Sequence, residues 1–213
     1  MINLSPDRAR IFRITHVNNL PWLLRNGLHC ASSGVRDPDF VTIGNPDIIG
    51  RRTSRTVPLA PGGVLEDYVP FYFTPCSVML FNIVTGYNDI TKRERDEIII
   101  IVSSLEMLEA HGVVFVFTDR HALVAYAQFF SDVRDLDRID WELLRARDFS
   151  RSDTDFGKVE RYQAEALGHR AVPVSALLGI ACHSDTSKAT VESMLADAEV
   201  DLRVVVKRGW FFG

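Results

Sequence analysis

Two nearly continuous apolar segments constrain the fold of this 213-residue chain more than any other feature. Residues 97–102 read EIIIIV and residues 113–117 read VVFVF. Short runs that are rich in β-branched and aromatic side chains are typical of strands covered on both faces. We therefore predict a central β-sheet with helices packed against it, which is a mixed α+β fold.

Weaker patterns place further elements around these two strands. Asn18 or Asn19 is expected to cap the first helix, and Ser103 or Ser104 the second. The secondary structure of segment 160–167 stays open, because its periodicity distinguishes neither a helix nor a strand. Strands are predicted at 11–15, 69–73, 180–183 and 202–206, and helices at 20–24, 105–109, 122–130, 141–145 and 187–196.

A long segment without periodicity separates the first helix from the strand at 69–73. Residues 31–61 collect Ser, Gly, Asp, Asn, Pro and Arg, so we expect a loop with short helical turns at most. Ordered loops of this length are uncommon and usually functional. The whole chain, 1–213, is expected to form one domain, since its length suits a single core.

Several function classes lack support in the sequence. No GxGxxG or GxxxxGK[ST] loop is present, and the six histidines show no HxxxH spacing. Cys30, Cys76 and Cys182 form no CxxC pair, so we expect buried free thiols rather than disulfides or a metal site. No apolar run approaches the roughly 20 residues of a membrane span. A cytoplasmic location without a membrane partner is therefore expected.

The formal net charge of −4 gives no global attraction to nucleic acid, so any such partner depends on local basic clusters. One cluster contains Arg51, Arg52 and Arg55, and a second contains Arg145, Arg147 and Arg151 with Lys158 and Arg161 following. A solvated arginine surface without a partner is the alternative interpretation. From composition and periodicity alone, the sequence predicts an α+β domain with one long loop that is expected to be functional.

Five segments together resemble the DarT family of toxins, in the family's order and over nearly the whole chain. They are Arg13–His16 with Asn19 and Leu20, Arg51 with Arg52, Pro61–Val64 running through Asp67–Phe73 (DYVPFYF), Phe117–His121, and Gln163–Glu165. The resemblance implies an ADP-ribosyltransferase-like fold with a central split β-sheet that grips NAD in an extended groove. It also implies transfer of ADP-ribose from NAD to a base of single-stranded DNA.

The resemblance assigns the catalytic roles to Glu165 and Arg52. A carboxylate that holds the ribose hydroxyl stabilises the oxocarbenium-like sugar formed when nicotinamide leaves. Arg52 matches the arginine that the family places over the acceptor base. Because an arginine keeps its proton far above neutral pH, we assign Arg52 the stabilisation of a base that loses its proton, together with a contact to the NAD phosphates. The alternative is a phosphate anchor without a part in the chemistry.

The resemblance also implies the contacts to both substrates. Thr15 and the backbone around Ile14 are expected to hold the nicotinamide amide. The segment 117–155 is expected to select the acceptor, through basic and aromatic side chains that hold unpaired bases. The residues expected at NAD are Arg13, Ile14, Thr15, Gly27, Leu28, Arg51, Tyr72 and Met79; those expected at the DNA are Arg120, His121, Arg147, Phe149 and Arg151.

One position departs from the family pattern. Many members carry histidine where this chain has Arg13, and an arginine there is suited to grip a phosphate. Part of the family modifies thymine and part guanine, and the Arg13 form favours the guanine branch. The acceptor remains open between these bases, and RNA or protein acceptors and a non-catalytic nucleic-acid-binding module are the alternatives. The implied biology is a toxin that blocks replication and is paired with a macrodomain antitoxin, DarG. A monomer is expected by default, because the sequence has no coiled-coil seam.

Overall fold

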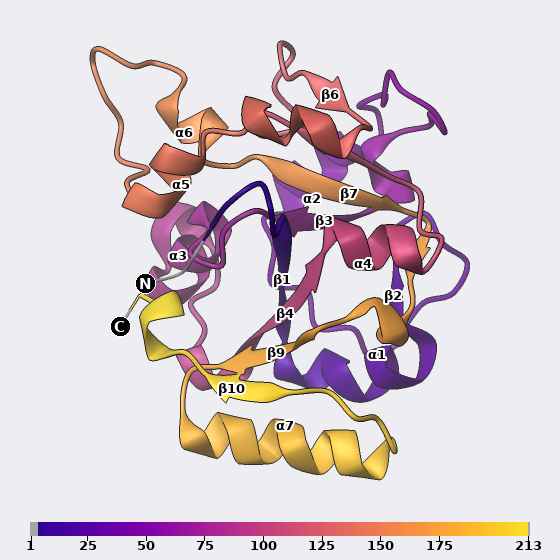
Figure 1. The fold of residues 1–213 in the computed structure, drawn as a ribbon. Coiled ribbons are helices and arrows are strands. Elements are labelled where there is room, and N and C mark those ends of the chain that lie inside the picture. The colour runs from indigo at the N-terminus through magenta and orange to yellow at the C-terminus, as the bar shows by residue number, and fades with distance from the viewer. Residues whose placement is uncertain (1–3, 213) are drawn as a thin grey trace.

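The structure, a computed structural model, describes residues 4–212, which are built around one large sheet (Figure 1). Within these residues the sheet has eight strands in the order β10-β9-β4-β1-β3-β7-β5-β6, and β2 pairs with β8 beside it. All pairs are antiparallel except β9 with β10. The strands are β1 (Arg10–His16), β2 (Leu28–His29), β3 (Tyr68–Tyr72), β4 (Ile98–Ser104), β5 (Phe115–Thr118), β6 (Phe129–Phe130), β7 (Glu165–His169), β8 (Ala171–Val172), β9 (Gly179–Cys182) and β10 (Val204–Val206).

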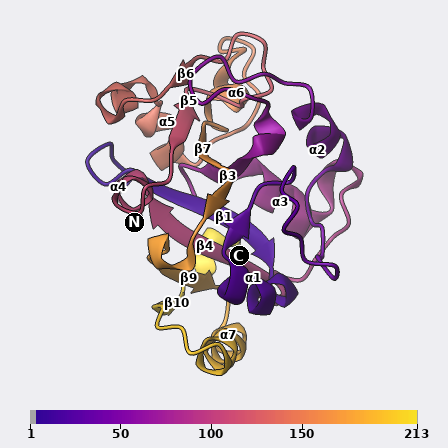
Figure 2. The same ribbon diagram turned by 90° about the vertical axis from the view of Figure 1, so that its right-hand side faces the viewer.

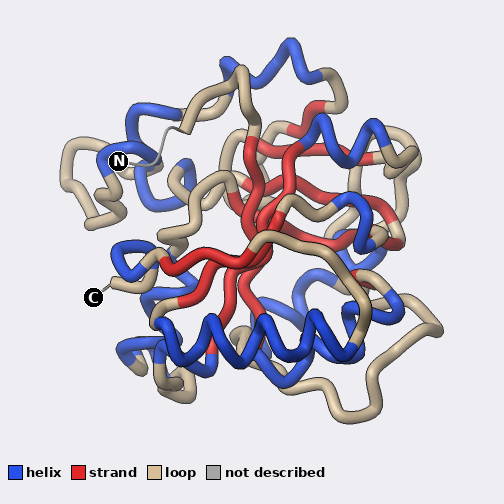
Figure 3. Tube along the Cα trace, turned by 60° about the horizontal axis from the view of Figure 1, so that its bottom comes forward, coloured by secondary structure: helices blue, strands red, loops and turns tan. Residues whose placement is uncertain are grey.

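The helices lie on both sides of the sheet, as the blue and red tube of Figure 3 shows. Figure 2 places α2 on the opposite side of the central strands from α4 and α5. This is the mixed fold with helices flanking a sheet that the sequence predicts. The helices are α1 (Leu20–Asn26), α2 (Pro46–Arg52), α3 (Val78–Thr85), α4 (Leu105–Ala110), α5 (Trp141–Ala146), α6 (Lys158–Arg161) and α7 (Asp185–Asp197).

The EIIIIV segment forms the centre of the sheet, as predicted. Ile98–Ile101 are fully buried in β4, which lies between β1 and β9. The VVFVF segment forms a shorter strand than predicted, because β5 begins at Phe115 and the Val114 side chain is 54% exposed. Burial of four consecutive isoleucines on both faces supplies a large share of the apolar area that holds the two halves of the core together.

A split between β1 and β3 divides the large sheet. β1 pairs with β4 at seven positions, whereas its pairing with β3 in the described residues is confined to Phe12 and Tyr72. After Phe12 the edge of β1 that faces β3 therefore has no ladder partner. Arg13 spans the gap, since its Nη1 donates to the Pro70 carbonyl oxygen at 3.0 Å. The predicted split sheet is confirmed at this point.

Strand alternation separates the two faces of the sheet around β1. Successive residues of a strand point to opposite faces, so Arg13 and Thr15 lie on one face and Phe12 and Ile14 on the other. Ile99 is the partner of Thr15 in β4 and packs in one cluster with Leu20 of α1 and Val191 of α7. Helices α1 and α7 therefore cover the face that carries Arg13 and Thr15.

Two local features differ from the prediction. Asn19, one of the two predicted caps, occupies the N-cap position of α1, but its side chain makes no capping hydrogen bond. Residues 122–130 are not helical; they form turns that lead into the short strand β6. The open segment 160–167 contains the end of α6 and the start of β7. The thiols of Cys30, Cys76 and Cys182 are buried and free, as predicted. No helix between residues 4 and 212 combines the length and apolar character that crossing a membrane requires.

Candidate active site

An ion pair between the long loop and the sheet forms the centre of the candidate site. Arg52, the last residue of α2, donates from Nη1 to Glu165 Oε2 at 2.8 Å. Glu165 is the first residue of β7. It lies opposite Tyr72 of β3, and β3 is the strand that borders the split. The two side chains are 13% and 4% exposed. Two side chains that are 113 positions apart in the sequence are thus bonded to each other beside the split in the sheet.

The environment of Glu165 keeps its carboxylate ionised. Burial by itself raises the pKa of this carboxyl, but the Arg52 charge and the hydrogen bonds to the carboxylate outweigh it and hold the pKa below its ordinary value. One of those bonds is donated by the Ala122 backbone N–H to Oε1 at 3.1 Å. Each carboxylate oxygen retains a lone pair for a further donor. The group is therefore a charged acceptor held in one orientation.

His121 stands beside this carboxylate in its neutral form. Its Nδ1 lies 3.6 Å from Glu165 Oε1, but it accepts a hydrogen bond from the Leu123 backbone N–H at 3.2 Å. An imidazole nitrogen that accepts a hydrogen bond carries no proton, so the ring hydrogen is on Nε2. Burial lowers the pKa of His121, which agrees with a neutral ring. His121 therefore presents an Nε2–H donor rather than a positive charge.

Tyr72 and Met79 flank the ion pair. The Tyr72 hydroxyl donates to the Met79 sulfur at 3.7 Å. Burial, followed by the nearby Glu165 charge, raises the pKa of Tyr72 well above its ordinary value, so the phenol stays protonated. Burial and the Arg52 charge lower the pKa of Arg13 to about 10, which leaves its guanidinium charged at neutral pH. Arg13 and Arg52 thus place two positive charges near each other, and Arg52 is the one that pairs with Glu165.

A cavity of about 430 Å³ opens next to this group, on the α1 and α7 face of the sheet. Among the residues expected at NAD, its lining includes Arg13, Thr15, Gly27 and Leu28, and the catalytic candidate Arg52 also contributes. Gly27 has φ +82°, and a Cβ there would lie 2.8 Å from the Val172 carbonyl oxygen. The chain can therefore turn from α1 into β2 at this wall only with glycine.

The long loop forms the outer wall of the cavity and is fastened to the body at separate points. The Asn19 amide donates to the Val41 carbonyl oxygen at 3.0 Å and accepts from the Val41 N–H at 2.8 Å. The same amide donates to Thr15 Oγ1 at 3.0 Å. Arg55 donates to the Ala122 carbonyl oxygen at 3.2 Å. These contacts order a segment that contains little regular structure, which agrees with the prediction of a loop with short helical turns.

Not every residue expected at NAD lines the cavity. The Ile14 side chain belongs to the main core, although the strand edge around it is open toward β3. Arg51 is exposed on α2 and lies near enough to His121 to contribute to lowering its pKa. Tyr72 lies opposite Glu165 and contacts Met79, and neither of them is among the residues that line the cavity. The structure thus brings together Arg13, Thr15, Gly27, Leu28 and Arg52.

Most of the residues expected at the DNA lie elsewhere. Arg120 is paired with Asp119 at 2.7 Å and leans over the Tyr126 ring. Arg147 donates to the Gly209 carbonyl oxygen in a second cleft. The Phe149 ring packs against three other aromatic rings, those of Phe81, Tyr162 and Phe212, so it belongs to an aromatic cluster instead of an open stacking surface. Arg151 is exposed.

Two residues of interest escaped the sequence interpretation. Asn19 was assigned to a helix cap, yet it fastens the loop over the cavity. Phe156 is 85% exposed in the segment between α5 and α6, where an aromatic side chain in a polar stretch (SDTDFGK) was the available signal. Exposed apolar rings of this kind often mark binding surfaces. Within residues 4–212, no three His, Cys, Asp or Glu side chains gather as metal ligands would.

Comparisons with known proteins find close matches over nearly the whole chain. A family model described as "ssDNA thymidine ADP-ribosyltransferase, DarT" matches residues 12–212. A DNA ADP-ribosyl transferase from Escherichia coli O127:H6 is 46% identical over 99% of this chain and 96% of its own. The structure of Thermus sp. 2.9 DarT in complex with ADP-ribosylated ssDNA superimposes with a TM-score of 0.90, at 33% identity, covering 99% of this chain and 100% of that one. The complex of the same Thermus protein with NAD+ gives 0.86 at 32% identity, over 97% and 99%.

Proposed function

The chain belongs to the DarT family, and from this premise we propose that it transfers ADP-ribose from NAD to a base in single-stranded DNA. The observation that carries the proposal is the buried pair of Arg52 and Glu165 beside a cavity of about 430 Å³. Relatives with the same fold are described with NAD+ and with ADP-ribosylated ssDNA. The site supplies the charges that such a transfer needs.

NAD brings to the reaction a ribose carbon that becomes positively charged as its bond to nicotinamide breaks. The ionised Glu165 carboxylate is fixed by Arg52 and Ala122, so it can accept a hydrogen bond from a ribose hydroxyl without reorganising. Its charge then stabilises the developing cation. The lowered pKa of Glu165 means that the carboxylate is already ionised at neutral pH.

Arg52 has a donor left over for the reaction. Its Nη1 binds Glu165, whereas its Nη2 is buried and has no hydrogen-bond partner within residues 4–212. A buried unpaired N–H is costly, and a ligand oxygen would satisfy it. The fixed positive charge stabilises an acceptor base that gives up its proton. The His121 ring, whose Nδ1 lies 3.6 Å from Glu165 Oε1, carries its hydrogen on Nε2 and so offers a second donor in this part of the site.

The cavity suits an extended dinucleotide. The unpaired edge of β1 after Phe12 offers backbone groups for the nicotinamide amide, and Thr15 borders the same wall. Arg13 and Arg52 lie on this wall and complement the negative charge of the pyrophosphate. Gly27 and Leu28 line the cavity near α1, where we place the adenosine. Tyr72 and Met79 then form the floor beside Glu165.

For the acceptor base, we take thymine. The matching family model is described as a thymidine transferase, while the arginine at position 13 favours the guanine branch. Arg13 is bonded to the Pro70 carbonyl oxygen across the split, so its guanidinium braces the NAD side of the site and leaves the acceptor side to other groups. That contact weakens the link between Arg13 and the acceptor. Arg120, Arg151 and His121 are our candidates for the DNA contacts, with His121 nearest the reacting atoms.

The proposal extends to the biological setting that the family implies. We propose that residues 1–213 act as one monomeric domain in the cytoplasm, as a toxin that blocks replication. Modified bases stall a polymerase, and an antitoxin that removes the mark restores growth. The partner is then a macrodomain protein of the DarG kind, whose pocket recognises ADP-ribose on DNA.

Incubation of the purified protein with labelled NAD and single-stranded oligonucleotides tests the proposal. Four oligonucleotides each lack one base, and the expected result is label on every DNA except the one without thymine. Failure of the guanine-free DNA alone would assign guanine instead. Label on RNA or on the protein but on no DNA would overturn the DNA proposal. NAD binding without transfer to any of these would identify a non-catalytic binding module.

The contact between Asn19 and the loop leads to a separate expectation about NAD. Asn19→Ala removes the partners of the Val41 N–H and carbonyl and of Thr15 Oγ1, all at a site where Asn19 is 2% exposed. Leaving such groups unpaired is expected to cost about 2 kcal/mol of unfolding free energy and to weaken NAD binding through a loosened wall. Urea denaturation and calorimetric titration with NAD measure the two effects. Asn18→Ala, at the exposed neighbour, is the matched control.

A further inference from the structure

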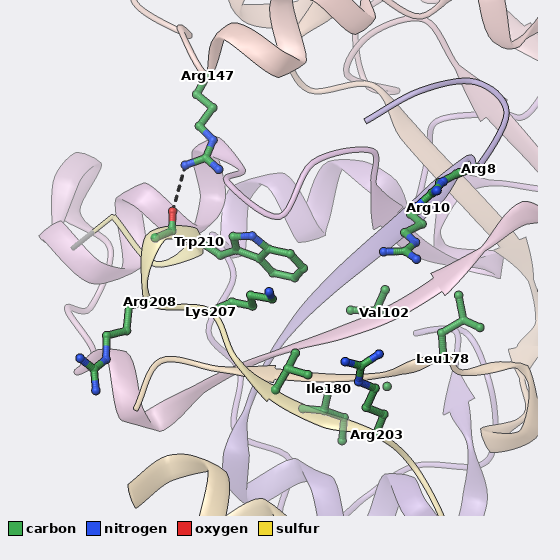
Figure 4. A pocket seen from close by; sticks show the side chains of 13 residues that line it. Arg8, Arg10, Val102, Arg147, Leu178, Ile180, Arg203, Lys207, Arg208 and Trp210 are labelled. Carbon is green, nitrogen blue, oxygen red and sulfur yellow. Dashed lines mark hydrogen bonds between the residues drawn. The ribbon is translucent and has the colours of Figure 1, made fainter. Parts of the chain in front are cut away.

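A second cleft, of about 810 Å³, is lined by six cationic side chains (Figure 4). They are Arg8, Arg10, Arg147, Arg203, Lys207 and Arg208. Its described lining includes no aspartate or glutamate. In a chain with a net charge of −4, this concentration of like charge is a strongly positive local field.

The basic cleft lies on the opposite face of the sheet from the proposed NAD cavity. Arg10 and Phe12 are two residues apart in β1, so both point away from the face of Arg13 and Thr15. Val102 is the cross-strand partner of Phe12 in β4 and also lines the basic cleft. The two cavities share no lining residue. The basic cleft is therefore a separate site.

Most of its charges are not neutralised within the described chain. Arg147 donates to a backbone carbonyl oxygen, and Arg208 pairs with Asp185 at 3.2 Å on the surface. The side chains of the other four cations have no hydrogen-bond or ion-pair partner within residues 4–212 and are exposed. Mutual repulsion of such charges is relieved when an anion binds between them. The arrangement therefore favours a ligand with repeated negative charge.

An aromatic ring accompanies the cations. The Trp210 indole packs edge-on against Phe12, with ring centroids 5.5 Å apart, and remains partly exposed. Figure 4 shows this ring between Lys207 and the strand that carries Arg10, with Arg147 above it. Grooves that hold single-stranded nucleic acid combine cations that follow the backbone with aromatic rings that stack on bases. An acidic protein ligand has no unpaired bases that would stack on this ring.

A single loop connects the basic cleft with the proposed active site. Arg147 ends α5 at the cleft, and the chain continues through residues 148–157 to α6 and then to Glu165. Along this stretch Arg151 and Phe156 are exposed, Phe156 by 85%. A positive side chain and an apolar ring are therefore exposed on the chain segment that leads from the basic cleft to Glu165.

From these observations we propose that the basic cleft holds the phosphate backbone of the substrate's own single strand, several nucleotides from the target base. The cleft then acts as an anchor that raises affinity for long strands without taking part in the transfer. This inference rests on the proposed function, because the strand it holds is the DNA that is modified. The anchor requires a single-stranded polyanion, but it does not require that the transfer reaction takes place.

The test compares strand binding by two doubly substituted proteins without NAD. Arg203→Gln with Lys207→Gln removes two charges of the cleft, whereas Arg25→Gln with Lys188→Gln removes two charges from α1 and α7 on the other face. Fluorescence anisotropy measures Kd for a long oligonucleotide and for a short one that covers the target base alone. The cleft variant is expected to bind the long strand on the order of tenfold more weakly near 0.1 M salt, with the slope of log K against log salt reduced by roughly 1.4.

The short strand and the control variant are expected to behave as the unchanged protein does. The KM for the long strand in transfer assays should rise with its Kd, while kcat and the KM for the short strand stay constant. Equal affinity of the cleft variant and the control for the long strand would overturn the inference. Weaker binding of poly-glutamate with unchanged DNA binding would overturn it in favour of an acidic protein partner. A long-strand effect in a protein that transfers no ADP-ribose would refute the proposed function and leave the anchor supported.

Discussion

Glu165→Gln is expected to lower the rate of ADP-ribosyl transfer by about 10³-fold, because it removes a preorganised charge from the reacting sugar. The substitution keeps the size of the side chain but not its bonding. Two donors face the carboxylate, Arg52 Nη1 and the Ala122 N–H. A neutral amide has one oxygen and can satisfy only one of them. The loss should appear in kcat with labelled NAD and DNA, while the Kd for NAD changes little.

The control for this substitution is Glu142→Gln, which neutralises an exposed glutamate in the first turn of α5. It should leave kcat unchanged. A decrease of less than tenfold in kcat for Glu165→Gln would contradict the assignment of Glu165 as the catalytic carboxylate. A decrease that comes entirely from a higher KM for NAD would assign it to binding alone.

Arg52→Ala is expected to destabilise the fold as well as to abolish transfer. It leaves the Glu165 carboxylate, 4% exposed, without the charge that neutralises it. Breaking a buried pair by removing one partner costs about 3 kcal/mol of unfolding free energy or more. Chemical denaturation at neutral pH measures this loss, and the labelled-NAD assay measures the loss of activity.

The loss should depend on pH in a definite direction. In the unchanged protein the lowered pKa of Glu165 contributes stability above the ordinary value of 4.5, which disappears as the pH falls through the lowered pKa. In the alanine variant, burial without Arg52 raises this pKa, so its penalty is present at neutral pH and disappears as the carboxyl becomes protonated. The difference in unfolding free energy between the two proteins should therefore shrink as the pH falls from the raised pKa of the variant, above 4.5, to the lowered pKa of the unchanged protein, below 4.5.

Arg52→Lys separates the two roles of the arginine. The lysine keeps the charge and should recover most of the stability, but it lacks the planar second donor that Arg52 Nη2 offers to the cavity. Transfer should stay roughly 10²-fold below that of the unchanged protein, as for loss of one preorganised donor. Full recovery of transfer would show that Arg52 serves only as a counter-charge for Glu165.

Sequence patterns predicted the elements whose environment is apolar and simple. The isoleucines of β4 and the leucines of α1 have little choice of partner, since burial of their apolar area dominates their placement. The α4 cap at Ser104 was also among the predicted alternatives, and its side chain accepts from the Met107 N–H. Local chemistry and tertiary structure agree at these positions.

Segment 122–130 shows why other elements were missed. A helix there requires its backbone groups to pair with one another, but Ala122 donates its N–H to Glu165 and gives its carbonyl oxygen to Arg55. The Val124 carbonyl oxygen also accepts from Arg55. Tertiary partners from distant segments therefore outcompete local helix propensity. The Asn19 side-chain oxygen likewise accepts from the Val41 N–H, 22 residues further along, instead of capping the helix.

The candidate site was predicted through family resemblance rather than through spacing. No periodicity relates Arg52 to Glu165 across 113 residues, and the tautomer of His121 depends on a backbone N–H that only the folded chain supplies. Arg147 and Phe149 were assigned to the DNA because they precede Glu165 in sequence. The turn after α5 directs Arg147 to the basic cleft, where we propose that the DNA backbone binds, whereas Phe149 packs in the aromatic cluster.

The long sequence separation within the Arg52–Glu165 pair also governs when a newly made chain can assemble its candidate site. During synthesis the loop, α2 and β1 leave the ribosome long before β7, which supplies the carboxylate. Contacts between such distant segments form late, because the intervening chain must first be closed. A ribosome that stalls before codon 165 releases a fragment that has the arginine but no active centre. The order of the strands thus postpones assembly of the candidate site until β7 has been made, 113 residues after the arginine.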